Sequence, residues 1–283
     1  MSINFEEVSH IYGLKTPFEY KALTDVSLKI DDGTFTAIIG QTGSGKSTLI
    51  QHINALLLPT SGTVKIDEFV ITANKKHDKL KPLRKKAGLV FQFPEYQLFE
   101  ETIEKDIIFG PINFGVEEKE AKNIAHKMLK LVGLDEEYLT KSPFDLSGGQ
   151  KRRVAIAGIL AMEPDILILD EPTAGLDPQG AKEMMDLFKK INETGVTIIL
   201  VTHDMNHVLK YCDEVVVMHK GKLERKDKVD NVFKDEEYLN QLGIDLPQIT
   251  SFILTLNQNG YHLDPSIKTT DELIDALGGQ LNG

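Results

Sequence analysis

The sequence has no tryptophan and a single cysteine, Cys212, among its 283 residues. One cysteine excludes both a disulfide framework and a cysteine metal site within the chain, and we expect Cys212 to be a small buried hydrophobe. The chain also lacks an excess of positive charge, since its formal net charge is −11 at pH 7. Affinity for DNA or RNA comes largely from neutralising phosphates, so the composition argues against a nucleic-acid partner.

Long apolar runs are missing as well. A membrane-spanning helix needs about 20 predominantly apolar residues, and the nearest stretch, residues 159–169, is interrupted by Glu163, Pro164 and Asp165. Residues 1–7 do not have the basic and then apolar layout of a signal peptide. We therefore expect a cytosolic chain that reaches a membrane only through a partner.

The chain does contain apolar strands that alternate with helical patterns. Strands are expected at residues 26–30, 35–39, 88–92, 165–170, 196–201 and 214–218. The runs at 165–170 and 196–201 are apolar enough to be buried on both faces of a parallel sheet. Between Gln92 and Asp165 the periodicity becomes helical. This order predicts an α/β fold with a mostly helical insertion.

The texture of the sequence changes near Val229 to short amphipathic segments. Thr269 and Glu272 have the spacing of a capping box at a helix start, and we expect Gly278 to end that helix. We interpret residues 1–228 as the main domain and residues 229–283 as a small C-terminal appendage.

A glycine-rich stretch lies between the predicted strand at 35–39 and a helical pattern. It matches G-x-x-x-x-G-K-[ST], the P-loop, in the strand–turn–helix context that its mechanism needs. Glycines let backbone amides surround phosphate oxygens, Lys46 reaches the outer phosphates, and Ser47 can ligate magnesium. The predicted nucleotide-binding residues are Gly40, Gln41, Thr42, Gly43, Ser44, Gly45, Lys46, Ser47 and Thr48.

An acidic pair, Asp170 and Glu171, follows four apolar residues at the end of a predicted strand. The C-terminal ends of strands form the usual ligand-binding edge of an open α/β sheet. One carboxylate there can hold magnesium while the next orients and deprotonates an attacking water. We predict Asp170 as a metal ligand and Glu171 as the catalytic base.

A second glycine-rich motif opens the helical pattern at residues 151–160. A helix N-terminus presents free amides and partial positive charge, so this motif predicts a second phosphate-binding device. Its residues are Ser147, Gly148, Gly149 and Gln150.

In this order, the motifs resemble those of the nucleotide-binding subunits of ATP-binding cassette (ABC) transporters over at least residues 3–225. The resemblance also covers Gln92, the D-loop ending at Asp177, and the switch His203. It implies a RecA-like P-loop NTPase core with an N-terminal antiparallel β subdomain and a helical signature subdomain at about residues 93–164. It further implies that two subunits hold ATP and Mg²⁺ between the P-loop of one and the signature motif of the other.

The same resemblance implies roles for three further side chains. His203 would contact the γ-phosphate, and Gln92 would serve both the metal site and catalysis. Tyr12 would stack on adenine, although Phe18 and Tyr20 are rivals for that role. His203 and His207 also have the spacing of a helical zinc pair, but His203 ends a predicted strand, so we favour the phosphate switch.

Residues 90–103 and 106–115 narrow the resemblance to ATPases of the energy-coupling factor (ECF) vitamin transporters, particularly the second of two paired ATPases. This implies a second, related ATPase as heterodimer partner, a transmembrane coupling protein, and exchangeable membrane subunits that capture the vitamin. The chain would then lie peripherally on the cytoplasmic face of the cell membrane. The C-terminal appendage would help to hold the ATPase pair together.

Several alternatives stay open. The chain could belong to a cobalt or nickel ECF importer, to another ABC transporter, or to a soluble ABC ATPase without a transport role. A homodimer is also open, because every catalytic motif lies on this chain. A DNA-repair ATPase is disfavoured because the short spacing between Gln92 and Ser147 leaves no room for a long coiled coil.

The segment after Gln92 combines aromatic residues with a proline and glutamates. A core can absorb Phe91, Phe99 and Ile103, but proline and polar residues prevent a continuous buried face over residues 93–98. We therefore expect Phe93, Tyr96 and Leu98 to be exposed and to dock the coupling protein, since exposed apolar patches often mark interaction sites.

Overall fold

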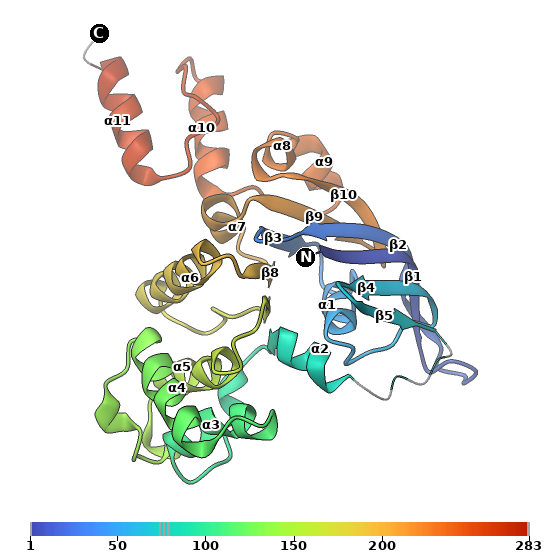
Figure 1. Cartoon of the computed structure of the whole chain (residues 1–283). Coiled ribbons are helices and arrows are strands. Elements are labelled where there is room, and N and C mark those ends of the chain that lie inside the picture. Colours follow the sequence, from blue (N-terminus) through green and yellow to red (C-terminus); the bar gives the residue numbers. More distant parts are fainter. Residues whose placement is uncertain (1, 74, 76, 78–79, 282–283) are drawn as a thin grey trace.

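The computed structural model describes residues 2–73, 75, 77 and 80–281, so residues 1, 74, 76, 78, 79, 282 and 283 of the expected domains lie outside it. Two β-sheets lie side by side, and a group of helices projects from one of them (Figure 1). The smaller sheet is antiparallel and has the order β2-β1-β4-β5. Its strands are β1 Ser2–Tyr12, β2 Tyr20–Asp31, β4 Ser61–Ile66 and β5 Phe69–Thr72.

The larger sheet has the order β10-β9-β3-β8-β7-β6, and its strands pair in parallel except for the β10 edge. Its parallel strands are almost entirely buried, which explains why the sequence shows continuous apolar runs there. The strands are β3 Phe35–Ile39, β6 Ala87–Val90, β7 Ile166–Asp170, β8 Thr197–Val201, β9 Glu214–His219 and β10 Lys222–Lys228.

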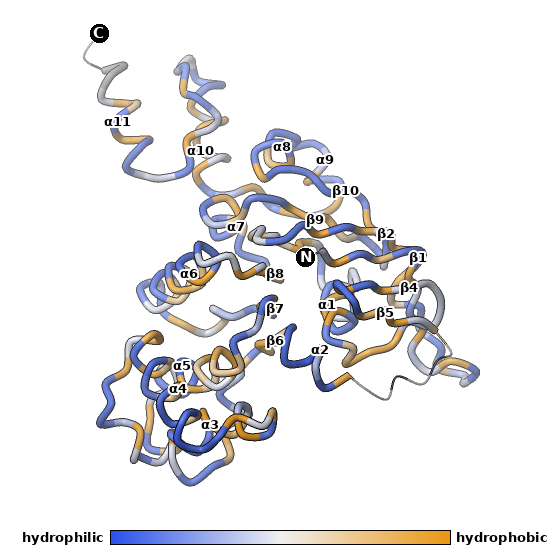
Figure 2. Tube along the Cα trace, in the orientation of Figure 1, coloured by the Kyte–Doolittle hydropathy of each residue, from blue (hydrophilic) through white to orange (hydrophobic). Residues whose placement is uncertain are grey.

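Helices cover the larger sheet and form the insertion between β6 and β7. The insertion contains α3 Ile103–Asn113, α4 Glu118–Leu131 and α5 Gly148–Leu160, which pack on one another. Apolar and polar residues alternate along α6 Pro178–Glu193 (Figure 2), as expected for a helix with one buried face. The remaining helices before the appendage are α1 Lys46–Ile53, α2 Lys81–Lys86 and α7 Met205–Tyr211.

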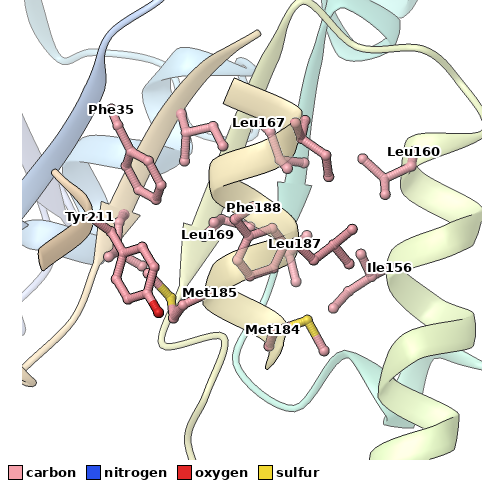
Figure 3. Packing of buried hydrophobic residues seen from close by; sticks show 14 of the residues in the cluster. Phe35, Ile156, Leu160, Leu167, Leu169, Met184, Met185, Leu187, Phe188 and Tyr211 are labelled. Carbon is pink, nitrogen blue, oxygen red and sulfur yellow. The ribbon is translucent and has the colours of Figure 1, made fainter. Parts of the chain in front are cut away.

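The main core lies between the sheet, α6 and α5. Phe35 of β3 and Leu169 of β7 face the same cluster as Phe188 of α6 and Ile156 of α5 (Figure 3). All four side chains are fully buried, and burial of such a side chain stabilises the fold by about 1.5–3 kcal/mol. Cys212 is buried in this cluster as well, as predicted.

The C-terminal residues form four helices: α8 Val229–Phe233, α9 Glu236–Gln241, α10 Gln248–Gln258 and α11 Thr270–Leu281. Val232 and Leu239 pack on the main core, whereas Ile253 and Leu273 belong to a small separate cluster. Helices α10 and α11 project away from the sheets (Figure 1). None of the helices in the described part of the chain has the length and apolar character of a membrane span.

Two local predictions differ from the structure. Helix α11 continues through Gly278, so the predicted stop there is wrong. An interior glycine lowers helix propensity by about 1 kcal/mol without forcing an end. The predicted strand at 88–92 runs only from Ala87 to Val90, because Phe91 and Gln92 turn away toward a 3₁₀ turn, η1 Pro94–Gln97. The capping box of Thr269 and Glu272 is present.

Candidate functional site

A cleft of about 370 Å³ lies beside the ends of β3, β7 and β8. This volume falls within the range of small-molecule sites. Most of its lining comes from the motifs that the sequence singled out. The lining residues are Tyr20, Ala22, Thr42, Gly43, Gly45, Lys46, Ser47, Thr48, Gln92, Asp170, Glu171, Val201 and His203.

The P-loop needs its glycines for conformation and for space. Gly40 has φ +147°, and a Cβ there would lie 2.2 Å from the Met218 carbonyl oxygen. Gly45 has φ +99°, and its Cβ would lie 2.7 Å from the Ala22 carbonyl oxygen. No side chain caps helix α1, which follows Gly45 directly. The first amides of α1 are therefore left to a ligand of the cleft, which favours an anion.

Lys46 holds the loop together from inside. Its ammonium donates hydrogen bonds to the carbonyl oxygens of Gly40, at 2.7 Å, and of Gln41, at 3.0 Å. Burial lowers the pKa of Lys46, and the Glu171 and Asp170 carboxylates oppose that shift. A cation thus sits among loop carbonyls at the point where a phosphate would need it.

Asp170 ends β7, and the Ser47 hydroxyl donates a hydrogen bond to it. Burial raises the pKa of Asp170 and the neighbouring Glu171 carboxylate adds to the rise, whereas Ser47 and Lys46 oppose it. Two carboxylates side by side in a partly buried site repel each other. A positive charge near Asp170 would relieve that repulsion.

Glu171 occupies an unusual backbone conformation. Its φ is +49°, and its amide donates to the Val201 carbonyl oxygen at 2.9 Å. Left-handed φ values in non-glycine residues cluster at functional sites. The Glu171 carboxylate Oε1 lies 2.9 Å from Nδ1 of His203, whose ring is otherwise exposed. The base and the switch predicted from separate motifs are thus in direct contact.

His203 precedes α7, in the turn that follows β8, whereas His207 lies on α7. Asp204 caps α7 by accepting from the amides of Asn206 and His207. The two histidines therefore do not share one helical face, which a helical zinc pair requires.

The three aromatic residues that could stack on adenine differ in their position relative to the cleft. Tyr20 lines the cleft, and its hydroxyl lies 3.4 Å from the Gly43 carbonyl oxygen. Tyr12 does not line the cleft but hydrogen-bonds through its hydroxyl to Thr48 Oγ1 at 3.1 Å. Phe18 is 86% exposed. The structure thus brings both tyrosines next to the P-loop helix and leaves Phe18 outside.

The signature motif and the D-loop residue do not line this cleft. Ser147 caps α5, and the residues after it form that helix's first turn. Asp177 caps α6 by accepting from the Gly180 amide at 2.7 Å. The second glycine-rich motif therefore lies outside the cleft that the P-loop lines.

A second cavity, of about 510 Å³, adjoins the P-loop and was not anticipated from the sequence. Gly40, Gln41, Glu171 and His203 line it together with residues 243–245, in the loop between α9 and α10. Gly243 has φ +63°, and a Cβ there would lie 2.0 Å from Gln41 Nε2. Gly243 and Pro247 indicate a turn in the sequence. No sequence pattern near them predicts that this turn contacts the P-loop.

The segment after Gln92 is only partly as expected. Phe93 is 38% and Tyr96 is 85% exposed, but Leu98 packs against the main core, so the expectation for Leu98 was wrong. Phe99 was expected inside and is 58% exposed, with its ring edge-to-face on Phe109.

Asp106 explains why Leu98 packs against the core and Phe99 is exposed, the opposite of what the sequence predicted. Its carboxylate accepts from the amides of Phe99, at 3.3 Å, and Glu100, at 3.2 Å. These hydrogen bonds fix the turn before α3, where Leu98 packs inward and Phe99 lies on the surface.

The sequence matches known proteins over nearly its whole length. The family described as ABC transporter matches residues 23–174. The energy-coupling factor transporter ATP-binding protein EcfA2 of Enterococcus faecalis is 54% identical over 278 residues, which are 98% of this chain and 96% of that protein. The EcfA2 protein of Bacillus cereus is 59% identical over 248 residues, covering 87% and 85% of the two chains.

Two solved structures are similar in fold. The ATP-binding cassette MJ0796, in a dimeric post-hydrolysis state bound to ADP and Pi, has a TM-score of 0.72 and 35% identity over 80% of this chain and 98% of that chain. The cbiO1 protein of Clostridium perfringens, part of the ABC transporter complex cbiONQ, has a TM-score of 0.74 and 38% identity over 89% and 98%. The chain therefore belongs to the ABC transporter family and, within it, to the ATP-binding subunits of energy-coupling factor transporters, ATPases whose hydrolysis is coupled to transport.

Proposed function

We propose that this chain hydrolyses ATP in the cleft beside the P-loop, with Glu171 as the catalytic base. The observation that carries the proposal is the contact between Glu171 and His203, at 2.9 Å, in the cleft that also holds Lys46 and Asp170. A base needs a partner that fixes its orientation, and a cation nearby to stabilise the phosphate charge. Both lie around Glu171.

The P-loop would bind the phosphates of ATP. Thr42, Gly43 and residues 45–48 of the predicted P-loop line the cleft. The N-terminus of α1 adds partial positive charge there, and Lys46 adds a full charge. Two unit charges 4 Å apart interact by about 4 kcal/mol at an effective dielectric of 20. An attraction of this size would allow a chain with a negative net charge to bind an anionic nucleotide.

Three oxygen-bearing side chains from β7, α1 and the segment after β6 fit a magnesium ion. Ser47 and Asp170 are already in contact through a hydrogen bond, and Gln92 lines the same cleft. All three present oxygen atoms, the ligands that Mg²⁺ prefers. When bound, the metal would neutralise charge on the phosphates and on Asp170. Ser47, Asp170 and Gln92 are the residues that would hold it.

During hydrolysis, Glu171 would accept a proton from the attacking water through its carboxylate. His203 would hold that carboxylate through Nδ1 and present its exposed ring edge toward the γ-phosphate. The left-handed backbone at Glu171 fixes the carboxylate at the end of β7. Gln92, two residues after β6, lines the same cleft and would sense the bound nucleotide.

A second subunit would complete the site. The chain's own cleft is not lined by Asp177 or by the signature residues Ser147, Gly148, Gly149 and Gln150. In the proposed dimer these residues would contact the ATP bound by the partner. The corresponding residues of the partner would contact the ATP bound by this chain. We propose a related ECF ATPase as this partner. In this proposal, residues 1–228 form the ATPase cassette, about 93–164 its helical subdomain, and 229–283 an appendage that contacts the second ATPase.

A transmembrane coupling protein would dock on the exposed aromatic surface after Gln92. Phe93, Tyr96, Phe99 and Phe109 expose apolar area on the helical insertion, beside the nucleotide-sensing loop. The chain would then be peripheral on the cytoplasmic face of the membrane. Exchangeable membrane subunits would capture a vitamin or a related micronutrient, and ATP would drive its uptake.

The variant Glu171→Gln tests the catalytic proposal in the assembled complex. We expect turnover to fall by at least about 100-fold, the usual contribution of a general base, while the Kd for ATP changes by less than about twofold. Glu163→Gln is the matched control, since Glu163 also has a left-handed φ, +52°, but lies outside the cleft. Near-normal turnover by Glu171→Gln would reject the proposed role.

The docking surface has a separate test. Phe93→Asp and Tyr96→Asp should reduce co-purification with the membrane protein and uncouple ATP turnover from transport, because a charge in an apolar contact loses its hydration. Val70→Asp is the control, since Val70 is exposed on the antiparallel sheet. Unchanged co-purification and transport would refute this docking site.

A further inference from the structure

A buried arginine lies next to the signature motif. Arg152, in the second turn of α5, is only 3% exposed. Its Nε and Nη2 donate to the two carboxylate oxygens of Glu95, at 3.0 and 2.8 Å. Its Nη1 donates to the carbonyl oxygens of Pro172, at 3.2 Å, and Ala174, at 2.6 Å. All three guanidinium nitrogens thus donate to two other segments of the chain.

These segments are the two loops that frame the cleft. Glu95 lies in η1, three residues after Gln92. Pro172 directly follows Glu171, and Ala174 lies between Glu171 and Asp177. The Arg152 side chain therefore joins the nucleotide-sensing loop to the loop that carries the catalytic base, and it does so from the helix that begins with the signature motif.

The geometry leaves little freedom at this junction. A guanidinium is a rigid planar fork, so a bidentate pair with a carboxylate fixes direction as well as distance. Phe93 has φ +57°, and its ring centre lies 5.6 Å from Arg152 Cζ. A Cβ on Gly175, which has φ +77°, would lie 3.7 Å from the same ring. The two loops are thus packed on each other around Arg152.

Glu95 is consequently unavailable as a surface charge. Both carboxylate oxygens of Glu95 are bonded to Arg152, and the Glu95 side chain is 14% exposed. Its place in the fold is an internal one.

We infer that Arg152 is a positioning residue that couples the loop after Gln92 to the loop after Glu171. A displacement of η1 would pull on Arg152, and Arg152 would move the carbonyls that flank the catalytic base. Such a contiguous polar link can carry coupling between sites. The inference rests on the proposed roles of Gln92 and Glu171.

The neighbouring Arg153 provides a matched control. It lies on the same helix, and it donates to the Val132 carbonyl oxygen at 2.8 Å and to Glu183 at 2.7 Å. These contacts face α4 and α6, away from the cleft loops. Loss of the Arg153–Glu183 pair removes a more exposed ion pair of the same helix without touching the junction.

The test compares Arg152→Gln, Arg152→Lys, Glu95→Gln and the double variant Glu95→Gln/Arg152→Gln with Arg153→Gln in the intact membrane complex. We expect kcat for ATP to fall by about tenfold or more in Arg152→Gln and Glu95→Gln, while KM changes by less than about twofold, as when transition-state positioning alone is lost. The double variant should be no slower than the worse single variant, because both remove one link. Arg152→Lys should recover only part of kcat, since lysine has no fork.

A kcat within twofold of wild type in folded Arg152→Gln would overturn the inference, and so would an equal loss in Arg153→Gln or strictly additive losses in the double variant. If Arg152→Gln does not fold, Arg152→Lys and Glu95→Gln are measured in its place. A kcat within twofold of wild type in both of these variants would then overturn the inference. Glu171→Gln is measured alongside. Near-normal turnover there would reject the proposed base, whereas normal Arg152 variants beside a Glu171→Gln variant that has lost at least about 100-fold would reject only the coupling.

Discussion

Helices α1 and α5 both begin at glycine-rich motifs of the phosphate-binding kind, but their first turns are completed differently. Helix α1 follows Gly45 in a left-handed conformation and has no side-chain cap. Helix α5 begins with a capping box, in which the Ser147 amide donates to Gln150 Oε1 at 3.1 Å and the Gln150 amide donates to Ser147 Oγ at 3.4 Å. The first helix leaves its amides to a ligand, whereas the second satisfies two of its own donors.

This difference indicates which half of the proposed site can bind a nucleotide in a single subunit. The P-loop half has its cation, its glycine conformations and its open amides in place. The signature half would have to exchange internal hydrogen bonds for bonds to a phosphate, and such exchanges have a small net free energy. The signature should therefore add little affinity until another subunit presents a bound nucleotide.

The largest expected effect comes from breaking the P-loop conformation. Gly40→Ala places a Cβ at 2.2 Å from the Met218 carbonyl oxygen, so we expect a loss of about 3 kcal/mol or more of unfolding free energy from strain and displaced backbone. ATP binding should be lost with it. Urea unfolding and ATP titration check this.

Gly148→Ala in the first turn of α5 is the counterpart, because no atom lies within 4 Å of the added Cβ. Its unfolding free energy should stay within about 0.5 kcal/mol of wild type. Equal destabilisation by the two substitutions would contradict the contrast between the loops.

Acid should weaken the α1 region more than the α5 region. His52 of α1 is fully buried, and burial lowers its pKa to about 4. Its Nδ1 hydrogen-bonds the Thr48 carbonyl oxygen at 2.7 Å, and the His10 ring lies edge-on at 4.9 Å. Helix α5 contains no histidine.

Because the folded pKa lies below the ordinary value of 6.5, His52 contributes stability above pH 6.5 that is lost as pH falls toward 4. The loss amounts to about 3 kcal/mol. Urea unfolding from pH 7.5 to 4 should show that the difference between wild type and His52→Gln shifts by this amount. A difference that does not vary with pH would disprove the assignment.

A smaller effect is expected at the signature end. Ser147→Ala removes the cap of α5, which should lower the unfolding free energy by about 1 kcal/mol. Hydrogen exchange of the amides in the first turn of α5 should speed up at the same time. No change in either measurement would mean that the capping box does not stabilise the helix.

The smallest effect concerns the adenine. We expect Tyr12→Ala to weaken ATP binding by about threefold to tenfold, the value of an aromatic stack, and Tyr12→Phe to bind nearly as wild type. Phe18→Ala is the control, since Phe18 is 86% exposed. A larger loss in Tyr20→Ala than in Tyr12→Ala would transfer the stacking role to Tyr20, which lines the cleft.

Much of the cleft could be predicted because its chemistry is encoded locally. Lys46 lies in the loop and helix after β3, and Asp170 and Glu171 lie at the end of β7, and the ends of such parallel strands meet at one edge. The strands themselves were visible as apolar runs because both faces are covered. Periodicity and short motifs were sufficient there.

Features that depend on contacts between distant segments could not be predicted. Leu98 packs against the core while Phe99 is exposed, because Asp106 of α3 bonds the amides of Phe99 and Glu100 and so fixes this turn. Gly243 reaches the P-loop only through the path of the chain after α9. Glu95 is internal because Arg152 lies 57 residues further along the chain and bonds both its oxygens. Sequence patterns record local periodicity and leave such pairings unspecified.

The most direct test of the account is the affinity of the purified full chain for ATP in Lys46→Ala and Ser147→Ala, with turnover of the assembled complex measured for both. We predict that Lys46→Ala raises the Kd of the single chain for ATP by about 100-fold, because a cation close to the phosphates is lost. Ser147→Ala should leave that Kd within about twofold of wild type, while turnover of the complex falls in both variants. A rise in the single-chain Kd for Ser147→Ala as large as that for Lys46→Ala would contradict the claim that the two motifs act on different nucleotides.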